Sequence, residues 1–372
     1  MEQKKILYIM HVPWAWIKQR PHFFAESLNK DFDLKVFFKR PLKVTKKNLI
    51  NQKSDNMSIS SFFIFPFQRV PILKNIKFLN RFNDIIVKYQ LPSLKEFDYI
   101  WVTSWSMYSV IHKILPSNIK LIYDCMDDEL EFPHIKDNHK ILKEAFLMEK
   151  KIMSRADVIF CSSEYLKNKI INRSGIKREI TVVNNAIAIP TISSVLTNNG
   201  QQVYDQLIKI DNVFMYVGAI SSWFDFESVI YALEKNPLIN FVLLGPKDVS
   251  IPIHSRLHHL GTVDRVDIFK LMENVRGLVM PFKLNELIKS VNPVKLYEYI
   301  YMSKPIISTR YLETEQFSDY IYLYNDKEEF SNRITGVLNG EFTIKRNSID
   351  YKDFALENTW DLRYETILKE IK

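Results

Sequence analysis

Cysteine is scarce in this sequence, and long apolar runs are missing. The two cysteines, Cys125 and Cys161, lack the close spacing of zinc ligands, and so low a count favours a reduced, cytosolic setting. No apolar run approaches the roughly 20 residues that a membrane-spanning helix needs. The start MEQKKILYIMHVPWAW is too short and polar for a signal peptide. We therefore expect a soluble or membrane-peripheral protein.

The chain does have the length and apolar content for sizeable cores. Its 372 residues suggest about two domains, and its 47% hydrophobic and 13% aromatic content is that of a globular protein. The sequence shows no internal repeat and no low-complexity tract. These features exclude a disordered or repetitive architecture.

Positive charge is concentrated in one segment. Residues 39–88 contain eleven lysines and arginines but only two acidic residues, Asp55 and Asp84, whereas the whole chain has a net charge of +8. The same segment holds the apolar stretch SSFFIFPFQRVPILKNIKFL. Basic residues beside apolar ones suit an anionic membrane surface. The alternatives are a solvated lysine-rich face and nucleic acid, but no base-reading motif supports a nucleic-acid partner.

The order of predicted elements indicates an α/β fold. KKILYIM (4–10) predicts a strand, PHFFAESLNKDF from Pro21 a helix, and DLKVFFK (33–39) a second strand. Strand, helix and strand at this spacing favour a parallel, doubly wound sheet. Further strands are predicted at 97–104, 120–128, 157–163, 180–187, 213–217, 239–246, 258–263, 276–282 and 305–309. The polar stretch 190–202 predicts a linker between two such halves.

The stretch 285–309, NELIKSVNPVKLYEYIYMSKPIIST, predicts a loop, a helix and a buried strand. Asn292 is the expected N-cap and Pro293 the first helical residue. A helix N-terminus flanked by Lys289 and Lys295 is a candidate anion site. Glu298, further along the helix, has the reach to accept hydrogen bonds from ribose hydroxyls. The alternative is an ordinary capped helix with solvated lysines.

The same stretch resembles the donor-binding segment of GT-B glycosyltransferases of the group that includes retaining family four. It is most similar to a bacterial cell-surface polysaccharide subgroup (teichuronic acid, capsule and O-antigen synthesis) that reads close to NELxxSVNPxKLYEYxxxxKP. One position departs from the wider group, which has two glutamates separated by seven residues. Ser290 stands where the first of them is expected, which leaves both retention and inversion of configuration open.

The resemblance implies two Rossmann-like domains that face each other across a cleft. The acceptor-binding domain would span residues 1–190, the nucleotide-sugar domain 204–352, and a crossover helix packing on the first domain 353–372. The loop after Gly218 lacks the arginine and lysine usual in the family, so lysines and the helix end are expected to meet the phosphates. The implied donor-binding residues are Gly218, Val263, Lys283, Lys289, Ser290, Val291, Asn292, Lys295 and Glu298.

Two segments of the first half are implied acceptor sites. The loop after the first strand resembles the subgroup's W-x-Q-R-P-H segment; its tryptophans offer flat faces for sugar rings, and Arg20 can bind phosphate. Its alternative interpretation is a packed aromatic loop. KLIYDCMDD (120–128) ends in three carboxylates, of which Asp127 is the acid/base candidate; loop capping or, less favoured, a metal site are its alternatives. The acceptor-binding candidates are His11, Trp14, Gln19, His22, Asp124 and Asp128, and the catalytic candidates Asp127, Arg20 and Glu286.

The resemblance thus predicts a metal-independent, cofactor-free glycosyltransferase. It would move a sugar from a nucleotide donor, expected to be UDP-linked, to a lipid-linked or growing surface glycan at the inner membrane face. Two alternatives remain. A GT-B-like nucleotide-sugar epimerase would turn over its donor without acceptor, and a silent glycan-binding protein would bind the donor without turnover.

Overall fold

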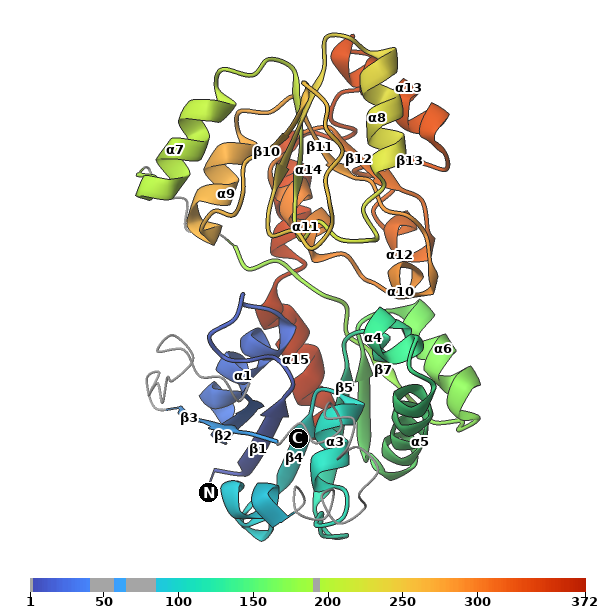
Figure 1. The fold of residues 1–372 in the computed structure, drawn as a ribbon. Coiled ribbons are helices and arrows are strands. Elements are labelled where there is room, and N and C mark those ends of the chain that lie inside the picture. Colours follow the sequence, from blue (N-terminus) through green and yellow to red (C-terminus); the bar gives the residue numbers. More distant parts are fainter. Residues whose placement is uncertain (1–2, 41–56, 65–84, 190–194) are drawn as a thin grey trace. The chain divides into compact units, whose positions relative to one another are not determined.

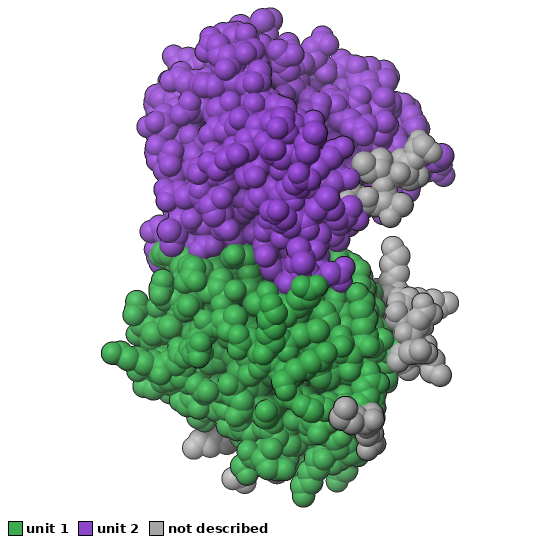
Figure 2. All heavy atoms as spheres, turned by 180° about the vertical axis from the view of Figure 1, so that it is seen from behind, with its two compact units in different colours: residues 1–184, 364–372 green, residues 185–363 purple. Residues whose placement is uncertain are grey.

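The computed structural model describes residues 3–40, 57–64, 85–189 and 195–372. The chain divides into two compact units, residues 1–184 with 364–372 (unit 1) and residues 185–363 (unit 2), coloured separately in Figure 2. Most of the basic segment predicted to face a membrane, residues 39–88, lies outside the described residues. Among the residues that are described, no helix has the length and apolar character to cross a membrane.

Unit 1 is built on a seven-stranded parallel sheet of order β3-β2-β1-β4-β5-β6-β7 (Figure 1). Its strands are β1 Lys5–Met10, β2 Asp33–Lys39, β3 Ser58–Phe62, β4 Tyr99–Val102, β5 Lys120–Cys125, β6 Val158–Cys161 and β7 Thr181–Val182. Its helical elements are α1 Arg20–Asp31, η3 Leu94–Glu96, α3 Trp105–Ile111, η4 Glu129–Glu131, α4 Pro133–Lys136, α5 His139–Arg155 and α6 Glu164–Ser174. Strands β1 and β4 are buried almost throughout, which is why their sequences read as continuous apolar runs.

Unit 2 repeats this plan with a six-stranded parallel sheet of order β10-β9-β8-β11-β12-β13. Its strands are β8 Val213–Val217, β9 Asn240–Leu244, β10 Leu257–His259, β11 Gly277–Met280, β12 Ile306–Thr309 and β13 Tyr322–Tyr324. Its helices are α7 Asn198–Leu207, α8 Phe226–Lys235, α9 Arg265–Met272, α10 Glu286–Lys289, α11 Val294–Tyr301, α12 Leu312–Glu315, α13 Lys327–Leu338 and α14 Ser348–Leu356.

Both sheets reverse their strand order at one point. In unit 1 the reversal lies between the paired strands β1 and β4, and in unit 2 between β8 and β11. In open parallel sheets, ligands bind beyond the carboxyl ends of the strands at such a switch point. The loops that follow these four strands are therefore the places to look for a site.

The C-terminal helix α15, Trp360–Ile371, begins in unit 2 and ends in unit 1. Its unit 1 portion is held by polar contacts. The Tyr364 hydroxyl donates to Asp31 at 2.8 Å, and the Tyr99 hydroxyl donates to the Ile371 carbonyl oxygen at 2.8 Å. The prediction that the chain ends in a helix packed on the first domain is confirmed.

Several predicted boundaries were wrong. Residues 190–202 were expected to form a linker, but α7 starts inside this stretch at Asn198 because the Thr197 hydroxyl accepts from the Gly200 N–H at 3.1 Å and caps it. The strands predicted at 180–187 and 258–263 are shorter, ending at Val182 and His259. Helix α11 begins at Val294 and not at Pro293, which is its N-cap.

Candidate functional site

In unit 2, two glycines let the backbone pack closely at the carboxyl ends of β8 and β9. A Cβ at Gly245 would overlap the carbonyl oxygen of Gly218, and one at Gly218 would lie 2.7 Å from the Tyr216 hydroxyl. The Gly218 N–H donates to the Leu244 carbonyl at 2.9 Å, which ties the two strand ends together. The predicted donor-binding residue Gly218 therefore lies at the switch point.

The loops after β8 and β11 are joined to each other. The Lys283 N–H donates to the Trp223 carbonyl at 2.7 Å, and the Asp225 N–H donates to the Pro281 carbonyl at 2.9 Å. The Asp225 carboxylate then caps α8 by accepting from the Ser228 N–H at 3.3 Å. These bonds fix the backbone of Lys283 while its side chain stays exposed.

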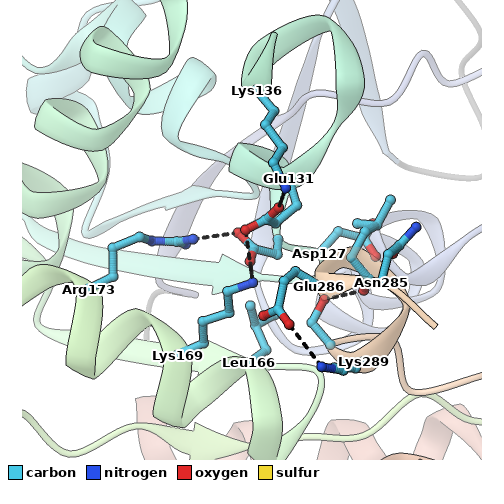
Figure 3. A network of polar contacts seen from close by, with 12 residues as sticks. Asp127, Glu131, Lys136, Leu166, Lys169, Arg173, Asn285, Glu286 and Lys289 are labelled. Carbon is cyan, nitrogen blue, oxygen red and sulfur yellow. Dashed lines mark hydrogen bonds and ion pairs between the residues drawn. The ribbon is translucent and has the colours of Figure 1, made fainter. Parts of the chain in front are cut away.

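Helix α10 carries Glu286 and precedes Ser290. Asn285 caps it by accepting from the Ile288 N–H at 2.9 Å, and Glu286 forms an ion pair with Lys289 at 3.0 Å (Figure 3). Ser290 is fully buried, and its hydroxyl donates to the Leu287 carbonyl at 2.6 Å. The serine that replaces the expected glutamate thus closes the last turn of α10.

Asn292 does not cap α11, contrary to the prediction. It is 1% exposed, and its Oδ1 accepts from the Asn185 N–H at 3.0 Å and from the Tyr297 hydroxyl at 3.2 Å. Its carbonyl oxygen accepts from the Asn185 side chain at 2.7 Å. Because the Asn292 Oδ1 accepts these hydrogen bonds and none from α11's first-turn N–H groups, the first turn of α11 has no side-chain cap. The buried Asn292 Nδ2 has no hydrogen-bond partner among the described residues.

We expect Asn292→Ala to lower the free energy of unfolding by about 1–3 kcal/mol, because it leaves the Asn185 N–H without its acceptor. Urea unfolding measures this loss. Tyr297→Phe is the matched partner, since the Tyr297 hydroxyl donates to the same Asn292 Oδ1 at 3.2 Å, whereas an alanine at position 185 would keep the backbone N–H. If the losses of the two single variants add fully in the double variant, the hydrogen bond between Tyr297 and Asn292 does not contribute to stability.

Glu298 is held by two cations. Its carboxylate lies 2.7 Å from Arg265 and 2.7 Å from Lys295, and its side chain is 2% exposed. Burial alone would raise the pKa of this carboxyl, but Lys295 and Arg265 outweigh it and lower the pKa below its ordinary value. Glu298 is therefore ionised at neutral pH, with its charge balanced by two partly exposed cations.

Arg265 was missed by the sequence reasoning. It opens α9, two residues after the predicted donor-binding residue Val263, which is partly buried. The only signal was an arginine at a strand-to-helix transition. Arg265 places a positive charge beside Glu298, whereas the loop after Gly218 contains no arginine or lysine. Val291, another predicted donor-binding residue, is held by a hydrogen bond in which its carbonyl oxygen accepts from the Tyr311 hydroxyl at 3.1 Å.

In unit 1, the predicted acceptor loop begins where β1 ends. The His11 N–H donates to the Thr103 hydroxyl at 3.0 Å, and the His11 Nδ1 lies 2.7 Å from the same oxygen. Thr103 follows β4, so this contact joins the two strand ends at the switch point. Burial, with a smaller effect of His22, lowers the pKa of His11 to about 4. His11 is thus neutral at physiological pH.

His22 lies in the first turn of α1 and is 3% exposed. Its Nδ1 accepts from the Gln19 N–H at 3.2 Å, and its ring packs on Trp14 with centroids 5.2 Å apart. Burial lowers the pKa of His22. Its buried Nε2 has no hydrogen-bond partner within the part of the chain that the structure describes. Trp14, Gln19 and His22 are therefore one cluster at the predicted acceptor loop.

Arg20 and Asp124 form a buried ion pair. Both side chains are at most 1% exposed, and the Arg20 Nη2 lies 2.7 Å from the Asp124 Oδ1. The Arg20 Nε donates to both carboxylate oxygens at 3.1 Å, and its Nη1 donates to the Val183 carbonyl. Two candidates from separate sequence motifs are thus brought together as mutual partners.

Asp127 and Asp128 differ in their surroundings. Asp128 is buried and forms ion pairs with Arg173 at 2.8 Å and Lys169 at 3.0 Å. Asp127 is half-buried, and no ion pair involving it is found among the described residues. Burial raises the pKa of Asp127 to about 6, with Arg20 opposing and Asp128 and Asp124 adding to the rise.

Further ion pairs anchor the loop that carries Asp127 (Figure 3). Arg173 also binds Glu149 at 2.6 Å, and Glu131 lies 3.0 Å from Lys169 and 2.7 Å from Lys136. The half-buried Asp127 therefore lies beside a network of ion pairs, and its carboxyl has a pKa in the range useful for proton transfer near neutral pH.

Sequence comparison finds a distant relative. No protein-family model matches the chain. TuaH of Bacillus subtilis (strain 168), named for a glycosyltransferase role in teichuronic acid biosynthesis, is 27% identical over 273 residues. That match covers 67% of this chain and 66% of TuaH.

Solved structures match along the whole chain. Anabaena HepE (Alr3699) in complex with UDP and glucose aligns with a TM-score of 0.73 at 13% identity and covers 100% of this chain and 99% of its own. Sucrose-phosphate synthase from Thermosynechococcus elongatus aligns with a TM-score of 0.73 at 12% identity, covering 99% and 98%. The chain has the GT-B fold of glycosyltransferases. The fold class predicted from the sequence is confirmed, and so is the resemblance to GT-B glycosyltransferases.

Each of the two units carries one of the clusters described above. The UDP-glucose complex of HepE aligns with a TM-score of 0.71 at 14% identity over 99% of both chains, so this fold accommodates a UDP-sugar in HepE. In this GT-B chain, the charged cluster around Glu298 belongs to unit 2 and the histidine and aspartate cluster to unit 1. The individual site residues remain predictions.

Proposed function

We propose that the protein is a glycosyltransferase that moves a sugar from a UDP-linked donor to a lipid-linked or growing cell-surface polysaccharide. The observation that carries the donor assignment is the uncapped N-terminus of α11, preceded by the buried Asn292 with an unused Nδ2 donor. The distant homology to TuaH and the UDP-bound state of HepE support the substrate class.

In unit 2, the diphosphate would bind at the first turn of α11. A helix start presents N–H groups without intrahelical partners and the positive end of the helix dipole. Lys283, Lys289 and Lys295 would add charge that stabilises the departing diphosphate, an electrostatic effect that often dominates catalysis. Glu298 would accept hydrogen bonds from the ribose, since each carboxylate oxygen keeps a second acceptor site beside its cation.

In unit 1, the acceptor and the transferred sugar would meet the cluster after β1, β4 and β5. Asp127 would take the proton of the acceptor hydroxyl, and Trp14 offers an aromatic face to a sugar ring. The Nδ1 of the neutral His22 accepts from the Gln19 N–H, so its Nε2 carries the proton and can donate one hydrogen bond. We propose that this step uses no metal and no cofactor. We also propose that the acceptor lies at the inner face of the membrane.

The test is thermal unfolding with a panel of nucleoside diphosphates and UDP-sugars. A ligand that binds only the folded state stabilises it by about 2.7 kcal/mol at a hundredfold excess over its dissociation constant. We expect UDP to raise the unfolding temperature of the wild type, and Glu298→Gln to reduce that shift. Each shift is measured against the variant's own ligand-free midpoint. Glu315→Gln, on the exposed α12 pair with Arg310, is the control that should leave it unchanged.

No response to any nucleotide would overturn the transferase proposal and favour a glycan-binding protein. Donor turnover in solution without an acceptor would favour an epimerase instead. An unchanged UDP shift in Glu298→Gln would remove Glu298 from the donor site but leave the transferase proposal standing.

A further inference from the structure

A second feature of unit 1 lies outside the proposed site. A cavity of about 370 Å³ lies between η4, α4 and α5, and its apolar lining residues are Leu130, Leu142 and Phe146. Lys136, His139 and Lys143 lie around it. Nothing in the proposed transfer reaction uses this groove.

Helix α5 has one buried side and one unusual exposed side. Its buried side packs through Ala145 onto a small core of Trp105, Leu130 and Ile135. On the other side, Phe146 is 37% exposed and Leu147 is 47% exposed. Two adjacent large apolar side chains therefore face outward next to the groove.

Lysines surround these two side chains. Lys143 lies one helical turn before Phe146 and Lys150 one turn after it, while Lys151 lies one turn after Leu147, and all three lysines are exposed. Among the exposed charged residues of α5, Lys140 is the fourth cation and Glu144 the one acid, an excess of three positive charges. The buried Glu149 does not offset this charge, because it is paired with Arg173.

We propose that this face of α5 docks on an anionic lipid bilayer. Phe146 and Leu147 would enter the interfacial region, and the four lysines would lie among the lipid phosphates. A soluble anion fits less well, because the Arg173 donors are bound to Asp128 and Glu149 and Lys136 is bound to Glu131. A second copy of the same face would bring like charges together. The inference deepens the proposed function and rests on it only for the membrane-borne acceptor.

The proposal is tested with the full-length protein and sedimenting vesicles of phosphatidylcholine, with or without phosphatidylglycerol. We expect binding to the anionic vesicles that weakens with added salt. Phe146→Ser with Leu147→Ser should weaken it about tenfold or more, through the lost apolar burial. Lys143→Glu with Lys150→Glu should weaken it by more than tenfold at low salt. The matched control is Ile349→Ser with Lys352→Glu on α14, which makes the same kind of change at exposed positions of unit 2.

Three results would overturn the proposal: no binding to anionic vesicles, equal binding to both kinds of vesicle, or α5 variants that bind as tightly as the control. Light scattering of the protein alone identifies self-association as the alternative use of this face. The UDP-induced thermal shift, measured on the same variants, is independent of the vesicles. A retained shift with unaltered vesicle binding would reject the docking face and leave the transferase proposal intact.

Discussion

Asp127→Asn is expected to lower the rate of sugar transfer by about 10²- to 10⁴-fold, the usual contribution of a positioned general base. Binding of UDP should be unchanged, because Asp127 belongs to unit 1 and the proposed nucleotide site to unit 2. The transfer rate at saturating donor and the UDP-induced thermal shift measure the two effects separately. A joint loss of both would contradict this division of roles.

The pH dependence of transfer follows from the pKa of about 6 at Asp127. A general base acts in its ionised form, so the rate should fall as the pH falls through about 6. His11 does not add to this limb, since burial holds its pKa at about 4. A profile that instead rises toward acidic pH would assign Asp127 the role of an acid.

The same pKa predicts that Asp127 destabilises the fold at neutral pH. Burial raises this pKa above its value of about 4 in an unfolded chain, so the folded state binds the proton more tightly. The stabilisation present below pH 4 is lost as the pH rises through 6. Asp127→Asn should therefore raise the free energy of unfolding at pH 8, by at most about 3 kcal/mol.

Glu131 is the matched control, because its pKa is shifted in the opposite direction. Burial would raise this pKa, but Lys136 and Lys169 outweigh it and lower it. Glu131→Gln should then destabilise the protein at pH 8 and have less effect at low pH. Urea unfolding at several pH values compares the two. If both variants changed stability in the same direction, the difference between these neighbouring carboxyls would not be electrostatic.

The sequence was sufficient for the elements that local pattern determines. The run KILYIM is buried on both faces of the sheet, so its apolar residues are continuous, and DLKVFFK forms a strand at its predicted bounds. The block around Lys295 and Glu298 was located by its motif alone. These features depend on residues a few positions apart, which is the range that periodicity and motifs report.

What the sequence could not supply are the partners that come from far along the chain. Asn292 looked like a helix cap, yet its oxygen binds Asn185, 107 positions away. Arg20 looked like a phosphate ligand, yet it pairs with Asp124 across 104 positions. Spacing in the sequence carries no information on such pairs, since only the folded chain brings these residues together.

The second large effect is expected at this pair. Arg20→Ala should lower the free energy of unfolding by about 3–5 kcal/mol, because it leaves the fully buried Asp124 charge without a partner. The Val183 carbonyl loses its donor as well. The midpoint of urea unfolding measures the loss. Lys18→Ala is the nearby control and should cost less than about 1 kcal/mol, since its pair with Glu26 is exposed.

Replacing both partners separates stability from catalysis. Arg20→Leu with Asp124→Leu removes both charges and fills much of their space, and such exchanges of buried pairs are often neutral or stabilising. We expect this variant to recover most of the stability that Arg20→Ala loses. If the stable double variant still transfers sugar, Arg20 acts by holding the start of α1 against β5 and the end of β7. If it is folded, binds UDP and is inactive, at least one of the two charged side chains contributes to the reaction itself, as the sequence predicted for Arg20 as a catalytic and Asp124 as an acceptor-binding residue.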